Sequence, residues 1–199
     1  MPAGTLVLLE KFCFKLYARD AGAIDPADAI PVFHRWIQNH TVEGLLIDVA
    51  DYRHVPDGPG VILIGHEADY FLDRAEGPLG LLYSRKRMAE GSNNDRIRTG
   101  LRHALRACLA LEREPEFADR GLEFAGDRLR FIVNDRLAGP NDDETLQLLR
   151  PVVEAVVREV YPGDPVRIER DDTDPRARFA LHITASSSDD VATLVERLS

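Results

Sequence analysis

Val61-Ile62-Leu63-Ile64-Gly65-His66 and Phe179-Ala180-Leu181-His182 are two apolar runs that each end in a histidine. Short apolar runs of this kind are typical of buried strands. Both runs fall at the same place in a β-α-β-β-α order of predicted elements, so the chain repeats one structural pattern. In the first half the elements are residues 12–19, 27–40, 45–49, 61–64 and 95–111, with an extra short strand at 80–83. In the second half they are residues 129–134, 143–161, 166–169, 178–184 and 189–198.

This order predicts an α+β protein made of two ferredoxin-like β-α-β-β-α repeats, with antiparallel strands and the helices packed on one face. The charged segment 112–121 contains Pro115 and separates a first repeat at residues 1–114 from a second at residues 121–199. Residues 67–79 are predicted to be irregular. We expect one compact pseudo-symmetric unit, and the pattern leaves open whether the repeats share one continuous sheet or pack sheet to sheet.

The composition predicts a cytoplasmic protein that does not bind membranes. No window reaches the roughly 18 apolar residues that span a bilayer. The N-terminal stretch up to Lys11 lacks the basic region and long apolar run of a secretory signal peptide. Cys13 falls in a predicted strand and Cys108 on the apolar face of a predicted helix. Both are therefore expected to be buried thiols rather than part of a disulfide or metal framework.

The charge is unevenly distributed along the chain. The net charge is −9, which argues against binding to nucleic acid because phosphates would repel the protein. The segment from Arg85 to Arg113 nevertheless holds eight basic residues against three acids, so that its own charge is +5. This reversal points to an anionic ligand or an acidic protein surface as a partner.

His66 is the first candidate for chemistry, since it follows a buried strand and a glycine. Imidazole titrates near neutral pH and binds metals, so His66 could act as a general acid or base or as a metal ligand, with Glu67 and Asp69 beside it. The alternative is a strand end whose polar side chains are satisfied by local hydrogen bonds. The sequence names no particular metal or cofactor.

A second polar cluster lies at the other end of the same predicted hairpin and comprises Asp48, Asp51, Tyr52 and His54. If residues 45–49 and 61–64 pair as an antiparallel hairpin, Asp51 and His54 lie at its closed end and His66 at its open end. Four residues at roughly 3.3 Å each then separate the two ends by more than about 10 Å. A joint metal site of the two clusters would require the loop to fold back along the sheet.

The basic segment supplies the candidate ligand-binding residues, which are Arg85, Lys86, Arg87, Arg98 and Arg102. Arg98, Arg102 and Arg106 are spaced by four residues and therefore line one face of the predicted helix. Arginine suits carboxylate and phosphate ligands because its guanidinium group presents a fork of donors. The alternative is a solvated helix face that is neutralised by acids elsewhere in the chain.

Two weaker signals concern loops. Residues 57–60, Asp-Gly-Pro-Gly, could approach a phosphate closely, but they precede a strand rather than a helix, which favours a structural turn. The polar groups 134–136 and 19–20 end corresponding strands of the two halves, where a pseudo-symmetric protein could build paired ligand sites.

Two hypotheses of function follow. The first is a cytosolic binding or regulatory module for a small anionic ligand or an acidic protein surface. The alternative is an enzyme that uses His66 as acid/base or metal ligand on an anionic substrate held by Arg85 and Lys86. A homodimer, in which two copies extend the pseudo-symmetry to four repeats, is compatible with both.

Overall fold

The computed structural model describes residues 9–20, 24–56, 58–75, 77–87 and 89–199. The first eight residues, on which the expectation about a signal peptide depends, lie outside the described residues. The same holds for Asp57 of the candidate phosphate loop. Among the described residues, no helix is long and apolar enough to cross a membrane.

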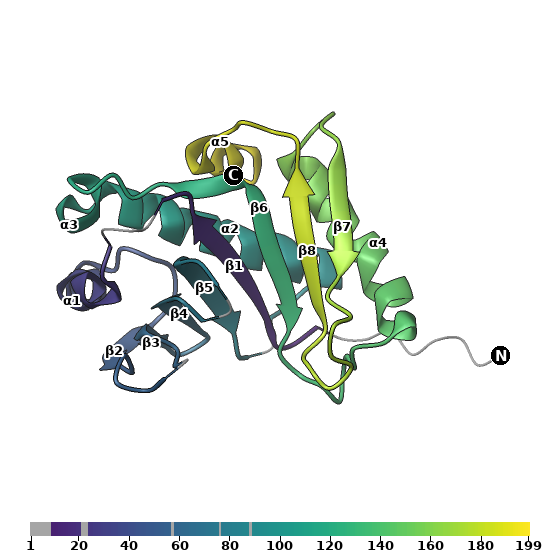
Figure 1. Ribbon diagram of the computed structural model, residues 1–199, viewed down its shortest axis with the longest axis horizontal. Helices are drawn as coiled ribbons and strands as arrows, with labels where there is room; N and C mark the ends of the chain where they lie inside the picture. Colours follow the sequence, from purple (N-terminus) through teal and green to yellow (C-terminus); the bar gives the residue numbers. More distant parts are fainter. Residues whose placement is uncertain (1–8, 21–23, 57, 76, 88) are drawn as a thin grey trace.

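The chain forms an α+β fold in which helices separate groups of strands (Figure 1). Its strands are β1 (Phe12–Ala18), β2 (Leu46–Asp51), β3 (Val61–Gly65), β4 (Ala68–Asp73), β5 (Gly80–Arg85), β6 (Phe124–Val133), β7 (Val166–Arg170) and β8 (Ala180–Ala185). Its helices are a 3₁₀ turn (Pro26–Asp28), α1 (Ala29–Asn39), α2 (Asn93–Arg113), α3 (Pro115–Ala118), α4 (Asp143–Val160) and α5 (Val191–Arg197).

The eight strands of the described residues belong to one continuous antiparallel sheet with the order β2-β3-β4-β5-β1-β6-β8-β7. This order decides between the two arrangements that the sequence left open, because β1 and β6 pair directly. In Figure 1, α2 and α4 lie behind the sheet, and none of the helices that the structure describes covers the face toward the viewer. We call this side of the sheet, which faces the viewer, the open face.

One prediction about the first half is wrong. Residues 67–79 were expected to be irregular, but they contain β4, and the extra strand at 80–83 extends to Arg85 as β5. β4 has no clear alternation of apolar and polar residues, because Tyr70 and Leu72 face the helices while Phe71 lies on the open face among other apolar groups. β5 pairs with both β4 and β1 and so joins the central strand to the meander β2-β3-β4-β5.

The main core lies between the sheet and the helices, and it is densest where β1 and β6 meet. Phe14 is paired with Phe131 across the two strands, and their ring centroids are 5.3 Å apart. Phe12 lies 6.0 Å from each of these rings. α2 packs directly on this cluster: a Cβ built at Gly100 would lie only 2.4 Å from the Phe12 ring, so glycine permits the close approach. Cys13 and Cys108 are buried free thiols, as the sequence predicts.

Candidate functional site

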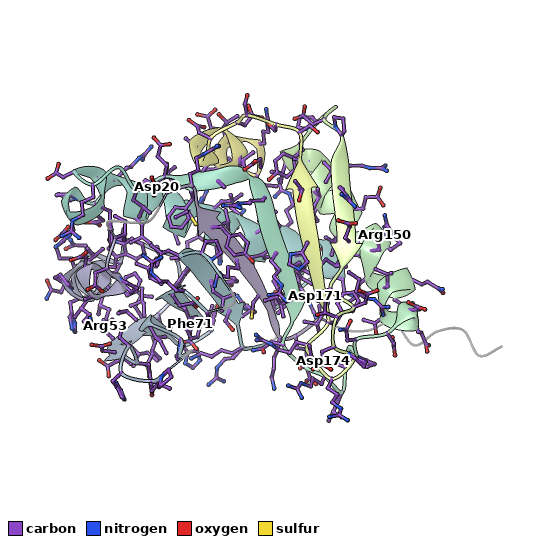
Figure 2. The ribbon with its side chains drawn as sticks, viewed as in Figure 1. Asp20, Arg53, Phe71, Arg150, Asp171 and Asp174 are labelled. Atoms are coloured by element: carbon purple, nitrogen blue, oxygen red, sulfur yellow. The ribbon has the colours of Figure 1, made fainter. Side chains whose placement is uncertain are left out.

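The open face carries a cleft of about 440 Å³ over β4, β5, β1 and β6. A cleft of this volume falls in the range of small-molecule sites, which are mostly apolar with a few placed polar groups. Its apolar lining comes from Cys13, Phe71, Leu82 and Ile132, and Figure 2 labels Phe71 on this part of the sheet. Cross-strand pairing brings these side chains together, because Phe71 lies opposite Leu82 and Cys13 opposite Ile132.

A fully desolvated ion pair lies in the lining of this cleft. The Lys15 ammonium group is 2.6 Å from a carboxylate oxygen of Asp73, and the two side chains are 2% and 3% exposed. Lys15 Nζ also donates to the carbonyl of Ala75 at 2.5 Å, and the Ala75 N–H donates to Asp73 at 2.9 Å. A Cβ at Gly80 would come within 2.9 Å of Lys15 Cε, so glycine leaves the room that the lysine needs.

Burying two charges costs several kcal/mol per ion, and a pair of this kind is weak evidence for stability. Lys15 and Asp73 therefore suggest a role in placing charge at the cleft.

Arg178 and Asn134 add polar groups to the same cleft. Arg178 lies before β8, and its guanidinium group donates to Asn134 Oδ1 at 3.0 Å. Asn134 belongs to one of the two polar strand ends considered in the sequence. Arg19 and Asp20 belong to the other, and they lie at the opposite end of the sheet because β1 and β6 are antiparallel (Figure 2). The two polar groups do not form one site.

The sequence-predicted residues His66, Glu67 and Arg85 lie elsewhere, around a small cavity of about 20 Å³. This volume is close to that of a single water molecule. Glu67 is 3.4 Å from the Arg85 guanidinium group, whereas His66 is exposed and its backbone carbonyl accepts from Arg87 Nε at 3.0 Å. These four residues therefore come together at one end of β3, β4 and β5.

Asp69 and Lys86 are paired with each other rather than with this cavity. Their charged groups are 2.7 Å apart, and Asp69 also accepts from the Gly65 N–H. Asp69 lies opposite Ser84 on the open face, whereas Tyr70 beside it is buried in the core. The three predicted catalytic residues thus divide between two faces of the sheet.

Sequence reasoning missed a partly buried polar network beside the small cavity. The Glu43 carboxylate contacts His103 Nε2, and His103 Nδ1 is 3.5 Å from the Tyr83 hydroxyl. Burial lowers the pKa of His103 and raises that of Tyr83, so both groups are neutral near neutral pH. A neutral imidazole can donate to Glu43 while it accepts from Tyr83. In the sequence the only signal for this network was His103, a histidine on the apolar side of a helix. Its partners, Glu43 and Tyr83, come from two distant segments.

The basic helix face is largely paired with acids. Arg98 contacts Glu159 at 2.8 Å, and Arg106 contacts Glu43. Arg102 lies near Glu43 as well. Burial acts to raise the pKa of that carboxyl, but neighbouring cations, Arg102 among them, hold it below its ordinary value. The ligand-binding roles of Arg85, Lys86, Arg87, Arg98 and Arg102 stay predictions, since most of their charge is already matched within the chain.

The two ends of the β2–β3 hairpin are separated as the sequence predicts, with Asp51 opposite Val61 and Leu46 opposite Gly65. Within the described part of the chain, no three histidine, cysteine or acidic side chains are grouped so that they could hold a metal ion. The sequence matches no protein-family model, no curated protein and no solved structure.

Proposed function

We propose that this chain is a cytoplasmic ligand-binding module that holds a small organic anion in the cleft of the open face. The observation that carries the proposal is the Lys15–Asp73 pair, because these charges are 2% and 3% exposed in the lining of a 440 Å³ cleft. The two buried free thiols support a reducing compartment.

The charges of the cleft define the ligand class. Two of the three charged side chains in the lining, Lys15 and Arg178, are positive, and the third, Asp73, is negative. Phe71, Leu82 and Ile132 offer an apolar surface to the rest of the ligand. A flat or compact apolar body with one carboxylate or sulfonate group fits this lining. An acidic protein surface is a poorer match, because the basic helix face that would receive it is paired with Glu43 and Glu159.

We also propose that the two halves are related ferredoxin-like repeats. In the second half, β8 returns beside β6 and β7 lies outside it, as in a split β-α-β unit. In the first half, β5 returns beside β1 in the same way, with β2, β3 and β4 outside it. The first repeat would then differ from the second by one added hairpin, and the β1–β6 pairing would join them.

The ligand proposal predicts that the protein binds 1-anilinonaphthalene-8-sulfonate, an aromatic monoanion, at one saturable site. We expect Arg178→Ser to raise its Kd by roughly tenfold or more, because a charge-assisted hydrogen bond is worth about 1.5–3 kcal/mol. Titration calorimetry measures the change.

Arg176→Ser is the matched control, since Arg176 is exposed in the same loop and does not line the cleft. Equal Kd values for the two variants would reject the cleft as the anion site. Native mass spectrometry of freshly purified protein, compared with its denatured mass, adds a second readout: a co-purified organic anion supports the proposal and identifies the natural ligand.

The second candidate function is an enzyme that uses His66 on an anionic substrate. It is favoured by one observation, namely that His66, Glu67 and Arg85 line the same cavity. This candidate predicts hydrolysis of an anionic ester such as p-nitrophenyl phosphate, with the rate abolished in His66→Asn and kept in His34→Asn, which alters an exposed histidine of α1. A rate that survives in His66→Asn removes the candidate.

A further inference from the structure

The two edges of the sheet are built differently. At the β2 edge the pairing with β3 is interrupted by a bulge between Leu46 and Asp48. Beside this bulge, the backbone N–H of Val49 donates to Oδ1 of Asp48 in the same strand, at 2.8 Å. Bulges and charged side chains on an edge strand are devices that prevent pairing with another strand. The β2 edge is therefore closed to sheet extension.

The β7 edge has no bulge between Val166 and Arg170, and its charged side chains, Arg167, Glu169 and Arg170, are of both signs. β7 pairs with β8 in an unbroken register from Val166 to Arg170. The N–H of Asp171 donates to the carbonyl of Ala180, and the N–H of Ser186 donates to the carbonyl of Pro165. These two bonds show which positions of β7 are hydrogen-bonded to β8. Because hydrogen-bonded positions alternate in an antiparallel pair, the N–H and C=O groups of Val166, Ile168 and Arg170 point away from β8, toward the free edge.

The space beside this edge is not filled by the residues that the structure describes. A groove of about 940 Å³ runs between β7 and α4 and is lined by Leu146, Arg150 and the whole of β7. In Figure 1, β7 is the outermost strand with α4 behind it, and Figure 2 shows Arg150 beside that edge. A strand added to β7 would lie in this groove.

The sequence of β7, Val166-Arg167-Ile168-Glu169-Arg170, is complementary to itself in the antiparallel direction. We propose that β7 pairs with β7 of a second copy of this chain around a two-fold axis at Ile168, so that the two sheets become one. In this register Val166, Ile168 and Arg170 form the hydrogen-bonded positions, which are the positions that the ladder leaves free.

The side chains also match in this register. Arg167 faces Glu169 of the partner subunit, and the same pair occurs a second time by symmetry. These are non-hydrogen-bonded positions, where side chains approach most closely and opposite charges stabilise the pairing. In one copy Arg167 and Glu169 contact each other at 2.6 Å and are 75% and 52% exposed, so exchanging this contact for the one between copies costs little. On the other face Ile168 meets Ile168 of the partner subunit beside Leu146.

The charge of the groove does not oppose the approach of a second copy. The chain as a whole is −9, but the groove holds three arginines and three acids, which are Arg150, Arg167, Arg170, Asp143, Glu169 and Asp172. Two such surfaces can meet without the repulsion that the overall charge would cause.

Sedimentation velocity on charge variants tests the proposal. The wild type is expected to be a dimer in the micromolar range, and Arg167→Glu and Glu169→Arg are each expected to raise the dimer Kd at least about tenfold, since two attractive pairs become repulsive. The double variant Arg167→Glu/Glu169→Arg restores opposite charges and is expected to dimerise like the wild type. An equimolar mixture of the two single variants is expected to form heterodimers, because each strand then meets the opposite charge.

Arg158→Glu is the matched control, as its side chain is also 75% exposed and lies outside the groove. Circular dichroism confirms that each variant is folded. A monomeric wild type overturns the proposal and leaves the β7 edge to an extended peptide of another protein. Single variants that stay dimeric, or a mixture that stays monomeric, overturn it as well, because the dimer would then use another surface.

Discussion

Asp73→Asn is expected to lower the free energy of unfolding by about 3–5 kcal/mol, the largest effect that we predict for a polar residue. The substitution leaves the Lys15 ammonium group, whose side chain is 2% exposed, without its counter-charge. Removing one partner of a buried pair is far more costly than removing both, because the remaining charge stays desolvated. Urea denaturation monitored by circular dichroism measures the change.

Two variants make this prediction specific. The double substitution Lys15→Met/Asp73→Leu removes both charges at similar volume and should be clearly more stable than Asp73→Asn. Lys86→Met breaks the partly exposed pair with Asp69 and should cost less than about 1 kcal/mol. If Asp73→Asn lowers the free energy of unfolding no more than Lys86→Met does, water reaches Lys15 and the cleft is more hydrated than its geometry indicates.

Phe131→Ala is expected to lower the free energy of unfolding by about 3–5 kcal/mol, as is usual when a buried aromatic residue is truncated. Phe131 is fully buried, and its ring lies 5.3 Å from Phe14 at the junction of the two halves. We further expect a single cooperative transition with an unchanged denaturant slope, because the described strands of both halves share one sheet and one common core.

Phe71→Ala is the matched control, because Phe71 is only half-buried on the open face. It should cost distinctly less and should weaken binding of the sulfonate probe. Two separate transitions in Phe131→Ala would show that the halves at residues 1–114 and 121–199 unfold independently.

The sequence was sufficient for the fold class and for most elements, because their signals are local. Apolar runs such as Val61–Ile64 and a capping box at Ser92 and Asp95 mark their own strand and helix. β4 was missed since it lies near the middle of the sheet, where Tyr70 and Phe71 meet apolar neighbours on opposite faces and the usual alternation is lost.

The candidate site depends on pairings that no local pattern contains. Lys15 stands between Phe14 and Leu16, and a charged residue between two core residues was the one available signal. Its partner Asp73 comes from the segment predicted to be irregular, and the two meet only because β5 places β4 close to β1. The same reasoning explains why Glu43 and His103 were not connected.

The place of β1 at the centre of the sheet also has a consequence for folding. β1 pairs with β5 on one side and with β6 on the other, and both follow it at long distances along the chain. Contacts between distant segments must overcome a large loop-closure entropy, which makes proteins rich in such contacts slow to fold. During synthesis, β1 remains without either neighbour until the first half is nearly complete, and its second edge waits for β6. The nascent chain therefore presents an apolar strand with unpaired edges for an extended period, and it is at this stage that chaperones would protect it.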